Sequence, residues 1–249
     1  MKITIGVNKS VQDNAGYYYD RAKQSKKKIE GAKKAYEITL KKIENFKERN
    51  QAKEVKIERE KKWYEKFRWY ISSEGKLVIG GRDATSNDII VKKHTSKGDL
   101  IFHTEMPGSP FVVIKAEKKE ITEQEIKEAG EFCATNSKAW NQSLSTSDVF
   151  YVEHGQLKQD QGLGKGSFNV DGPRKFLKSI VQQGIGILED GRVMGGSVDA
   201  VKKNCKHHLI IKQGSVKKSD LAKDIKYKLG KAAEIELDLD DIMQALPPG

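Results

Sequence analysis

The sequence contains few cysteines and no long apolar run. Two cysteines in 249 residues, Cys133 and Cys205, cannot form the disulfide framework of a small secreted domain. No apolar run approaches the roughly 18 residues that a membrane-spanning helix needs, and the N-terminus lacks the apolar stretch of a secretory signal peptide. We therefore expect a cytoplasmic protein of a reducing compartment, with no membrane partner.

Patterns that carry catalysis or hold a cofactor are also missing. The segment around Lys165 resembles a phosphate-binding loop, but Gly166 separates that lysine from Ser167, and a second glycine-rich segment gives only a truncated dinucleotide fingerprint. His207 and His208 are neighbours in an expected strand, so they point to opposite faces and do not bind one metal together. No nucleophile, base or metal cluster has a usable spacing. We expect no catalytic residues, no enzyme activity, no metal and no cofactor.

Positive charge is abundant and unevenly distributed. Lys and Arg outnumber Asp and Glu by 46 to 35, which gives a net charge of +11 and a pI near 9.4. Residues 20–67 hold 17 Lys or Arg and 9 Asp or Glu, so this stretch alone carries +8. Such a balance favours a polyanionic partner, either a nucleic acid or an anionic membrane surface.

The first quarter of the chain predicts a helical arm. Neither Gly nor Pro occurs between Gly31 and Gly75. Small and apolar residues follow the 4-3-4-3-4 spacing of a coiled-coil seam and continue with slight slippage: Tyr18, Ala22, Ser25, Ile29, Ala32, Tyr36, then Leu40, Ile43 and Phe46. We expect residues 1–62 to form a basic coiled-coil arm. It is either one rod of roughly 70 Å at about 1.5 Å per residue, or a hairpin that turns at Arg49, Asn50 and Gln51.

From residue 63 onwards the pattern changes to short apolar runs that can bury a core. We expect an α+β fold in which the long helical coiled-coil arm precedes a compact mixed β-sheet domain with flanking helices at residues 63–249. Residues 155–172 predict a long surface loop around one short strand. Strands are expected at residues 67–72, 76–80, 99–103, 110–115, 148–152, 167–170, 185–189 and 207–213. Helices are expected from residues 85–88, from the capping box at 122–125 towards Trp140, and at 198–204, 219–229 and 238–246.

The most distinctive segment is the turn at residues 79–85. Gly80 and Gly81 let a backbone approach a partner closely, and Arg82 stands at the expected N-terminus of a helix, whose free N–H groups and dipole favour an anion such as phosphate. The alternative is a tight strand-to-helix turn held by a contact between Arg82 and Asp83.

Further candidates for RNA contact carry positive charge or an imidazole ring. Lys92 and Lys93 could touch an RNA backbone, although a cationic helix C-terminus favoured by its own dipole explains them equally well. Tyr64, Arg68 and Tyr70 could stack on unpaired bases, while Phe67, Trp69 and Ile71 share the other face and fit a core. The complete set of predicted RNA-binding residues is Arg68, Arg82, Lys92, Lys93, His94, His103, Arg174 and Lys175.

Residues 62–87 closely resemble the RNA-binding domain, NFACT-R, of the NFACT family in its archaeal and eukaryotic type. The resemblance continues through residues 92–94, 98–100 and 107–109, and residues 13–18 and 245–249 are similar to the family's coiled-coil entry and domain end. Residues 156–166 depart from the family's pattern, which puts any contact made by that loop in doubt.

The resemblance implies a role in ribosome-associated quality control and the rescue of stalled ribosomes. Family members bind the large ribosomal subunit that still carries peptidyl-tRNA and recruit tRNA, so the expected partners are the large subunit, rRNA and tRNA. The coiled coil could also contact other quality-control proteins. Neither the family's N-terminal domain nor its helix-hairpin-helix segment is present in this sequence, so tail elongation is not carried over. The alternative is a protein-interaction adaptor that acts through its coiled coil without direct RNA recognition.

Overall fold

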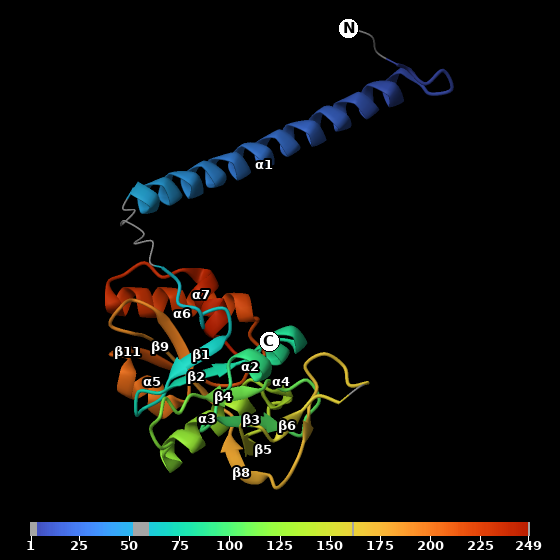
Figure 1. Ribbon diagram of the computed structural model, residues 1–249. Coiled ribbons are helices and arrows are strands. Elements are labelled where there is room, and N and C mark those ends of the chain that lie inside the picture. The colour runs from blue at the N-terminus through green and yellow to red at the C-terminus, as the bar shows by residue number, and fades with distance from the viewer. Residues whose placement is uncertain (1–3, 52–59, 161, 249) are drawn as a thin grey trace. The chain divides into compact units, whose positions relative to one another are not determined.

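The computed structural model describes residues 4–51, 60–160 and 162–248, with the backbone alone for residues 42–51. The chain divides into two compact units, Met1–Glu58 and Arg59–Gly249 (Figure 1). Among the described residues, no helix is both long enough and apolar enough to cross a bilayer.

The first unit is built on one long helix, α1, which spans Val11–Gln51. The side chain of Ser10 accepts a hydrogen bond from the backbone N–H of Asp13 (3.0 Å), which satisfies one free donor at the helix start. The helix continues through Arg49 and Asn50, so up to Gln51 the arm is a rod and does not turn back. Residues 52–59 and the side chains of the predicted seam residues Ile43 and Phe46 lie outside the described ranges. Apart from the half-buried Tyr18, the described seam residues are exposed, so the coiled-coil pairing stays a prediction.

The second unit contains a six-stranded antiparallel sheet in the order β1-β2-β4-β3-β5-β8. The predicted hairpin at its edge is confirmed, with Arg68 opposite Gly80 and Ile71 opposite Leu77. Gly75 forms the turn with a φ of +89°, a conformation that glycine adopts without steric cost. The strands are β1 Arg68–Ile71, β2 Leu77–Gly80, β3 Leu100–Thr104, β4 Val112–Ile114, β5 Thr146–Glu153 and β8 Lys175–Ile180.

A helix covers each face of this sheet, because successive side chains of a strand point to opposite sides. Val78 of β2 packs in the core beneath α3, Glu123–Thr135, whereas Ile79 packs in the core that also holds Ile90 of α2, Ala84–Lys93. The two helices therefore lie on opposite faces (Figure 1).

A three-stranded sheet in the order β10-β9-β11 completes the unit, with α5, α6 and α7 packed around it. Its strands are β9 Gln183–Ile187, β10 Val193–Gly196 and β11 His207–Ile211, and its helices are α5 Val198–Asn204, α6 Lys218–Ala233 and α7 Leu239–Ala245. The side chain of Asn204 donates to the carbonyl of Ile71 (3.0 Å), and Arg192 donates to the hydroxyl of Tyr64 (2.6 Å). These two contacts tie the smaller sheet to the β1 end of the larger one.

Several elements differ from the sequence-based expectation. The helix that opens at the Thr122 capping box ends at Thr135 and does not reach Trp140, because Ser137 caps a new short helix, α4, Lys138–Asn141. The cap of α2 is Asp83, so the helix starts one residue before the expected range. Within the expected long loop, β6 Leu157–Lys158 pairs with β7 Asn169–Val170. Strands β8 and β10 were not expected.

Candidate functional site

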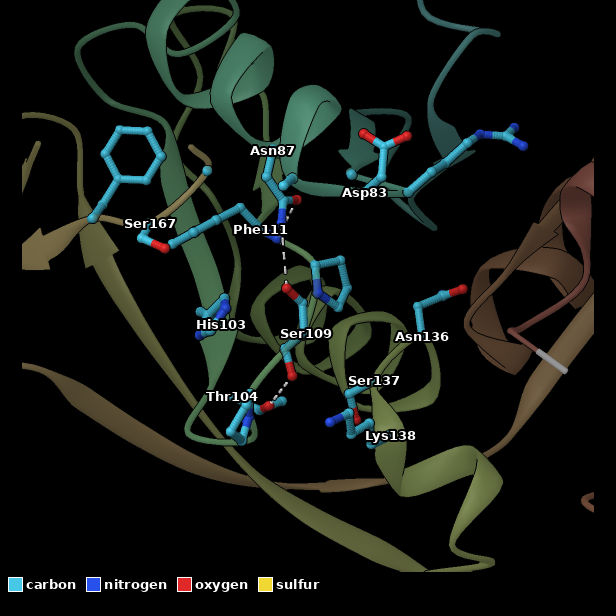
Figure 2. Close-up of a pocket in the computed structure, with 18 of the residues that line it drawn as sticks. Asp83, Asn87, His103, Thr104, Ser109, Phe111, Asn136, Ser137, Lys138 and Ser167 are labelled. Atoms are coloured by element: carbon cyan, nitrogen blue, oxygen red, sulfur yellow. Dashed lines mark hydrogen bonds between the residues drawn. The ribbon is translucent and has the colours of Figure 1, made fainter. Parts of the chain in front are cut away.

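The second unit contains a cavity of about 810 Å³, called here the first cavity. Its wall comes from the turn between β2 and α2, the end of β3 with the following turn, the start of α4, and the segment that leads through β7 towards β8. Figure 2 shows Asp83 and Asn87 on one side of this space, with Thr104, Ser137 and Lys138 on the other. Segments far apart in the sequence therefore share one concave surface.

Cationic side chains outnumber carboxylates in the wall of the first cavity. Its described lining holds five, namely Arg68, Arg82, Lys138, Lys165 and Arg174, against the carboxylates of Asp83 and Glu105. Five positive and two negative charges leave a balance of +3. One of the two carboxylates, that of Glu105, forms an ion pair with the guanidinium of Arg174 at 3.2 Å. The wall thus attracts an anionic ligand.

Arg68 and Arg82 are held by neutral oxygen atoms. The Nη1 atom of Arg68 donates to the carbonyl of Gly81 (2.8 Å), and the Nη2 atom of Arg82 donates to the carbonyl of Phe67 (2.9 Å). Burial, followed by the nearby charge of Arg82, lowers the pKa of Arg68 to about 10. Burial also lowers the pKa of Arg82, although Asp83 opposes the shift. Their positive charge is therefore fixed in place but not neutralised.

The N-terminus of α2 is closed by the protein itself. The Asp83 carboxylate accepts the backbone N–H of Ser86 (2.7 Å), while the hydroxyl of Ser86 accepts the N–H of Asp83 (2.9 Å). These hydrogen bonds, first of all those from Ser86, lower the pKa of Asp83. A Cβ on Gly81 would stand 1.8 Å from the side-chain oxygen of Asn87, so the close approach that glycine permits here is to the chain itself. The segment is thus a strand-to-helix turn, and phosphate binding by Arg82 stays a prediction. The expected Arg82–Asp83 contact is replaced by the hydrogen bond from Arg82 to Phe67.

The loop between β6 and β7 brings further groups to the first cavity. Gly166 has a φ of +75°, and a Cβ there would lie 2.4 Å from the carbonyl oxygen of Ala84. This close contact fixes the loop against the first residue of α2, where Lys165 and Phe168 join the lining. A glycine is needed at this point for both its backbone conformation and its lack of a side chain.

Aromatic rings form another part of the wall. The imidazole of His103 stacks on Phe111 at 4.4 Å between ring centroids, and Phe168 meets Phe111 edge-on at 5.5 Å. The guanidinium of Arg174 lies 4.7 Å from the ring centroid of Phe150. Burial lowers the pKa of His103, which favours the neutral form of the ring. Phe111 and Phe150 are each 5% exposed and belong to the core, so the half-buried rings of His103 and Phe168 are the ones that a ligand can reach. An accessible ring beside positive charges can stack on an unpaired nucleobase while the cations bind its phosphates.

Polar groups between the charges and the rings are already positioned. Asn87 accepts the backbone N–H of Phe111 (3.0 Å) and donates to the carbonyl of Ser109 (3.4 Å). The hydroxyl of Ser109 is hydrogen-bonded to that of Thr104, as Figure 2 shows. These bonds fix the turn that follows β3 against the start of α2.

The structure brings four of the eight predicted residues together. Arg68, Arg82, His103 and Arg174 all line the first cavity. The other four lie outside it, and any RNA contact they make stays a prediction.

Each of the four residues outside the cavity has a surface or structural contact of its own. Lys92 pairs with Asp88 (2.9 Å), and Lys93 is exposed in the last turn of α2. His94 stacks on Trp63 at 4.5 Å, and burial followed by the charge of Lys66 lowers its pKa. Lys175 is exposed, 5.8 Å from the ring centroid of Tyr151.

The sequence-based interpretation missed two cations and misplaced two aromatic rings. Lys138 and Lys165 line the first cavity. A lysine between two glycines in a loop was the available signal for Lys165, whereas nothing local distinguishes Lys138. Tyr64 and Tyr70, considered for base stacking, are 8% and 0% exposed, so both belong to the core instead. In the described ranges, no three His, Cys, Asp or Glu side chains are grouped to hold a metal ion.

Comparisons with known proteins address the same part of the chain. The family model of the NFACT protein RNA binding domain matches residues 66–172. The archaeal Rqc2 homolog aRqcH of Methanocaldococcus jannaschii is 32% identical over 202 residues, which cover 78% of this chain and 30% of that protein. The human ribosome quality control complex subunit NEMF is 36% identical over 186 residues, which cover 70% of this chain and 17% of that protein. Ribosome quality control complex subunit 2 of Schizosaccharomyces pombe is 30% identical over 172 residues, or 65% of this chain and 17% of that protein. The chain thus spans less than a third of the length of each of these relatives.

Proposed function

We propose that this chain, which belongs to the NFACT family and carries its RNA-binding domain, is an RNA-binding module of ribosome-associated quality control. It binds the large ribosomal subunit, tRNA or both on stalled nascent-chain complexes in the cytoplasm. It acts by binding, without catalysis, metal or cofactor.

One observation carries this proposal. All residues that line the first cavity, apart from Arg174 and Pro248, lie within the segment that matches the RNA binding domain. The part of the chain with RNA-binding relatives is therefore the part that folds into a cationic, aromatic-walled hollow. Phosphates neutralise the cations, while the half-buried rings of His103 and Phe168 offer stacking surfaces to bases that are not paired.

The helical arm adds a second cationic element to the proposal. Residues 11–51, which form α1, contain eleven Lys or Arg and six Asp or Glu. A net charge of +5 on an exposed helix favours contact with the phosphate backbone of rRNA and contributes to binding without sequence preference. The arm is thus proposed to dock on the ribosome while the domain contacts a particular RNA segment.

Filter binding to tRNA and to purified large subunits at two ionic strengths tests the proposal. Affinity should fall steeply between about 50 and about 200 mM salt, because each neutralised phosphate releases condensed counterions. The double variant Lys138→Gln with Arg174→Gln should bind more weakly. The slope of log K against log salt concentration should become less steep by about two, because two phosphate contacts are lost. Lys206→Gln removes one exposed charge outside the first cavity and is the control. Salt-insensitive or undetectable binding would refute the proposal.

The exposed seam of α1 favours a second candidate function. Ile29, Tyr36 and Leu40 are 57%, 66% and 39% exposed, although apolar residues at this spacing normally pack against another helix. A protein-interaction adaptor would cover them with a partner's coiled coil. Sedimentation with and without nuclease separates the two functions, because an adaptor keeps its partners after the RNA has been digested.

A further inference from the structure

A second cavity of about 450 Å³ lies between α4 and the segment that connects β11 to α6. Its described lining contains Lys212, Lys217 and Lys218 and includes no Asp or Glu. The half-buried ring of Trp140 forms part of the wall. The second cavity thus repeats the chemistry of the first, with cations beside an aromatic surface.

The two cavities adjoin each other. Asn141, the last residue of α4, lines both of them. The C-terminal segment after α7 also runs along both, because Leu246 and Pro247 line the second cavity and Pro248 lines the first. A ligand longer than one nucleotide can therefore occupy both hollows without leaving the surface.

Arg68 and Arg82 line the first cavity and Lys218 lines the second, and they are close enough for the two arginine charges to act on Lys218. These three cations are called here the central cluster. The Nζ atom of Lys218 donates to the carbonyl of Leu246 (3.3 Å), so this cation too is held by a neutral oxygen. Burial, then the charges of Arg68 and Arg82, lower the pKa of Lys218 to about 8. In the described part of the chain, none of the three forms an ion pair with a carboxylate.

An uncompensated cluster of this kind is unfavourable until an anion reaches it. Like charges that are held together and partly removed from water repel one another. A bound phosphate offsets that repulsion, because each cation is attracted to its negative charge. The surroundings also fit a chain of nucleotides better than a lone anion. Both volumes lie within the roughly 300–1,000 Å³ of pockets that enclose a small organic ligand.

We propose that the two cavities form one track for single-stranded RNA, in which the central cluster binds a backbone phosphate and each cavity receives an unpaired base. This inference rests on the proposed RNA-binding function and specifies its ligand. A duplex is excluded by its shape, because its bases are stacked inside and cannot enter hollows walled by protein rings. Single strands can splay their bases onto aromatic side chains.

Fluorescence anisotropy with the full chain tests the track. The probes are labelled single-stranded RNAs of two, four and eight nucleotides, and the eight-nucleotide strand annealed to its complement. The single strand should bind about tenfold more tightly than the duplex, and affinity should rise steeply from two to four nucleotides as the second cavity is filled.

Variants separate the second cavity from the rest of the surface. Lys212→Gln with Lys217→Gln replaces two exposed side chains, so folding is unaffected, and should abolish the gain in affinity between two and four nucleotides. Lys218→Gln should weaken binding of every single strand by about fivefold and reduce the salt dependence by about one. Lys206→Gln, at an exposed site outside both cavities, should change neither.

The possible failures are distinguishable. If the duplex binds as tightly as the single strand, or if the double variant retains the full length dependence, the track is refuted while the proposed RNA-binding function stands. If no RNA binds even in dilute salt, the proposed function itself fails.

Discussion

A substitution at Gly166 should detach a cavity-lining loop without unfolding the domain. An alanine Cβ there would lie 2.4 Å from the carbonyl oxygen and 2.9 Å from the Cα atom of Ala84, and these backbone atoms of α2 cannot move aside as a flexible side chain can. Alanine at a φ of +75° adds strain of about 1–2 kcal/mol. The loop should lift away from α2 and carry Lys165 and Phe168 with it. Losing one phosphate contact and one stacking surface should lower RNA affinity at least about fivefold and reduce the salt dependence by about one.

Gly162→Ala is the matched control for Gly166→Ala. Gly162 belongs to the same loop and has a φ of +98°, but nothing lies within 4 Å of the position its Cβ would take. It therefore introduces comparable backbone strain without a collision. Anisotropy with single-stranded RNA at several salt concentrations measures the affinity of both variants, and urea unfolding checks their stability. Equal RNA affinity for the two variants would show that docking of the loop against α2 does not shape the site.

Three further predictions concern buried and shifted charges. Lys76→Met should lower the free energy of unfolding by about 3–5 kcal/mol in urea titrations, because the carboxylate of Glu125, 2.6 Å away and fully buried, would lose its charged partner. Burial raises the pKa of Glu131, so the charged form of this residue destabilises the native state as the pH rises above 4.5. Glu131→Gln can still accept the hydrogen bond from Ser197, so it should be more stable than the native chain at pH 7. That gain should disappear as the pH falls to about 4, where the native carboxyl becomes protonated. RNA affinity should decline as pH rises through the Lys218 pKa of about 8, where the ammonium is lost, and Lys218→Gln should remove that decline.

Elements with local signals could be predicted from the sequence. The capping box of Thr122 and Glu125 and the hairpin at Gly75 depend on residues a few positions apart, so propensity and patterning suffice. Strand β8 is not predicted by the sequence pattern because it is an edge strand whose side chains are mostly exposed, which weakens the apolar alternation. Strand β10 escaped because it ends in two glycines. Packing requires both of them, since a Cβ on Gly195 would lie 2.3 Å from the carbonyl oxygen of Ala245 and a Cβ on Gly196 would lie 2.6 Å from the ring of Tyr70. These contacts are between residues far apart in the sequence, so no local pattern predicts them.

The candidate site was predictable only in part, for the same reason. Arg82 stood out because it follows two glycines at a strand-to-helix turn, which is a local feature. Lys138 and Lys165 become neighbours of that arginine only through the order of the six-stranded sheet and the docking of Gly166 on α2. Sequence spacing does not show that these residues lie close together. The charge composition predicts the class of ligand, whereas the geometry of the first cavity depends on tertiary structure.

The half-buried cations of the central cluster differ from other cations of this domain that folding removes from water, because those have carboxylate partners. Lys76 has Glu125 as a partner at 2.6 Å, and the ammonium of Lys115 is paired with Asp99. Removing a charge from water is costly unless an opposite charge or strong hydrogen bonds replace the water, so pairing is the expected outcome of folding. The three cations of the central cluster donate hydrogen bonds to neutral oxygen atoms instead, although carboxylates are plentiful on the surface of the chain. A polyanion that supplies the opposite charge on binding accounts for this difference, and it explains why the unpaired cations lie where two cavities meet and not at scattered positions.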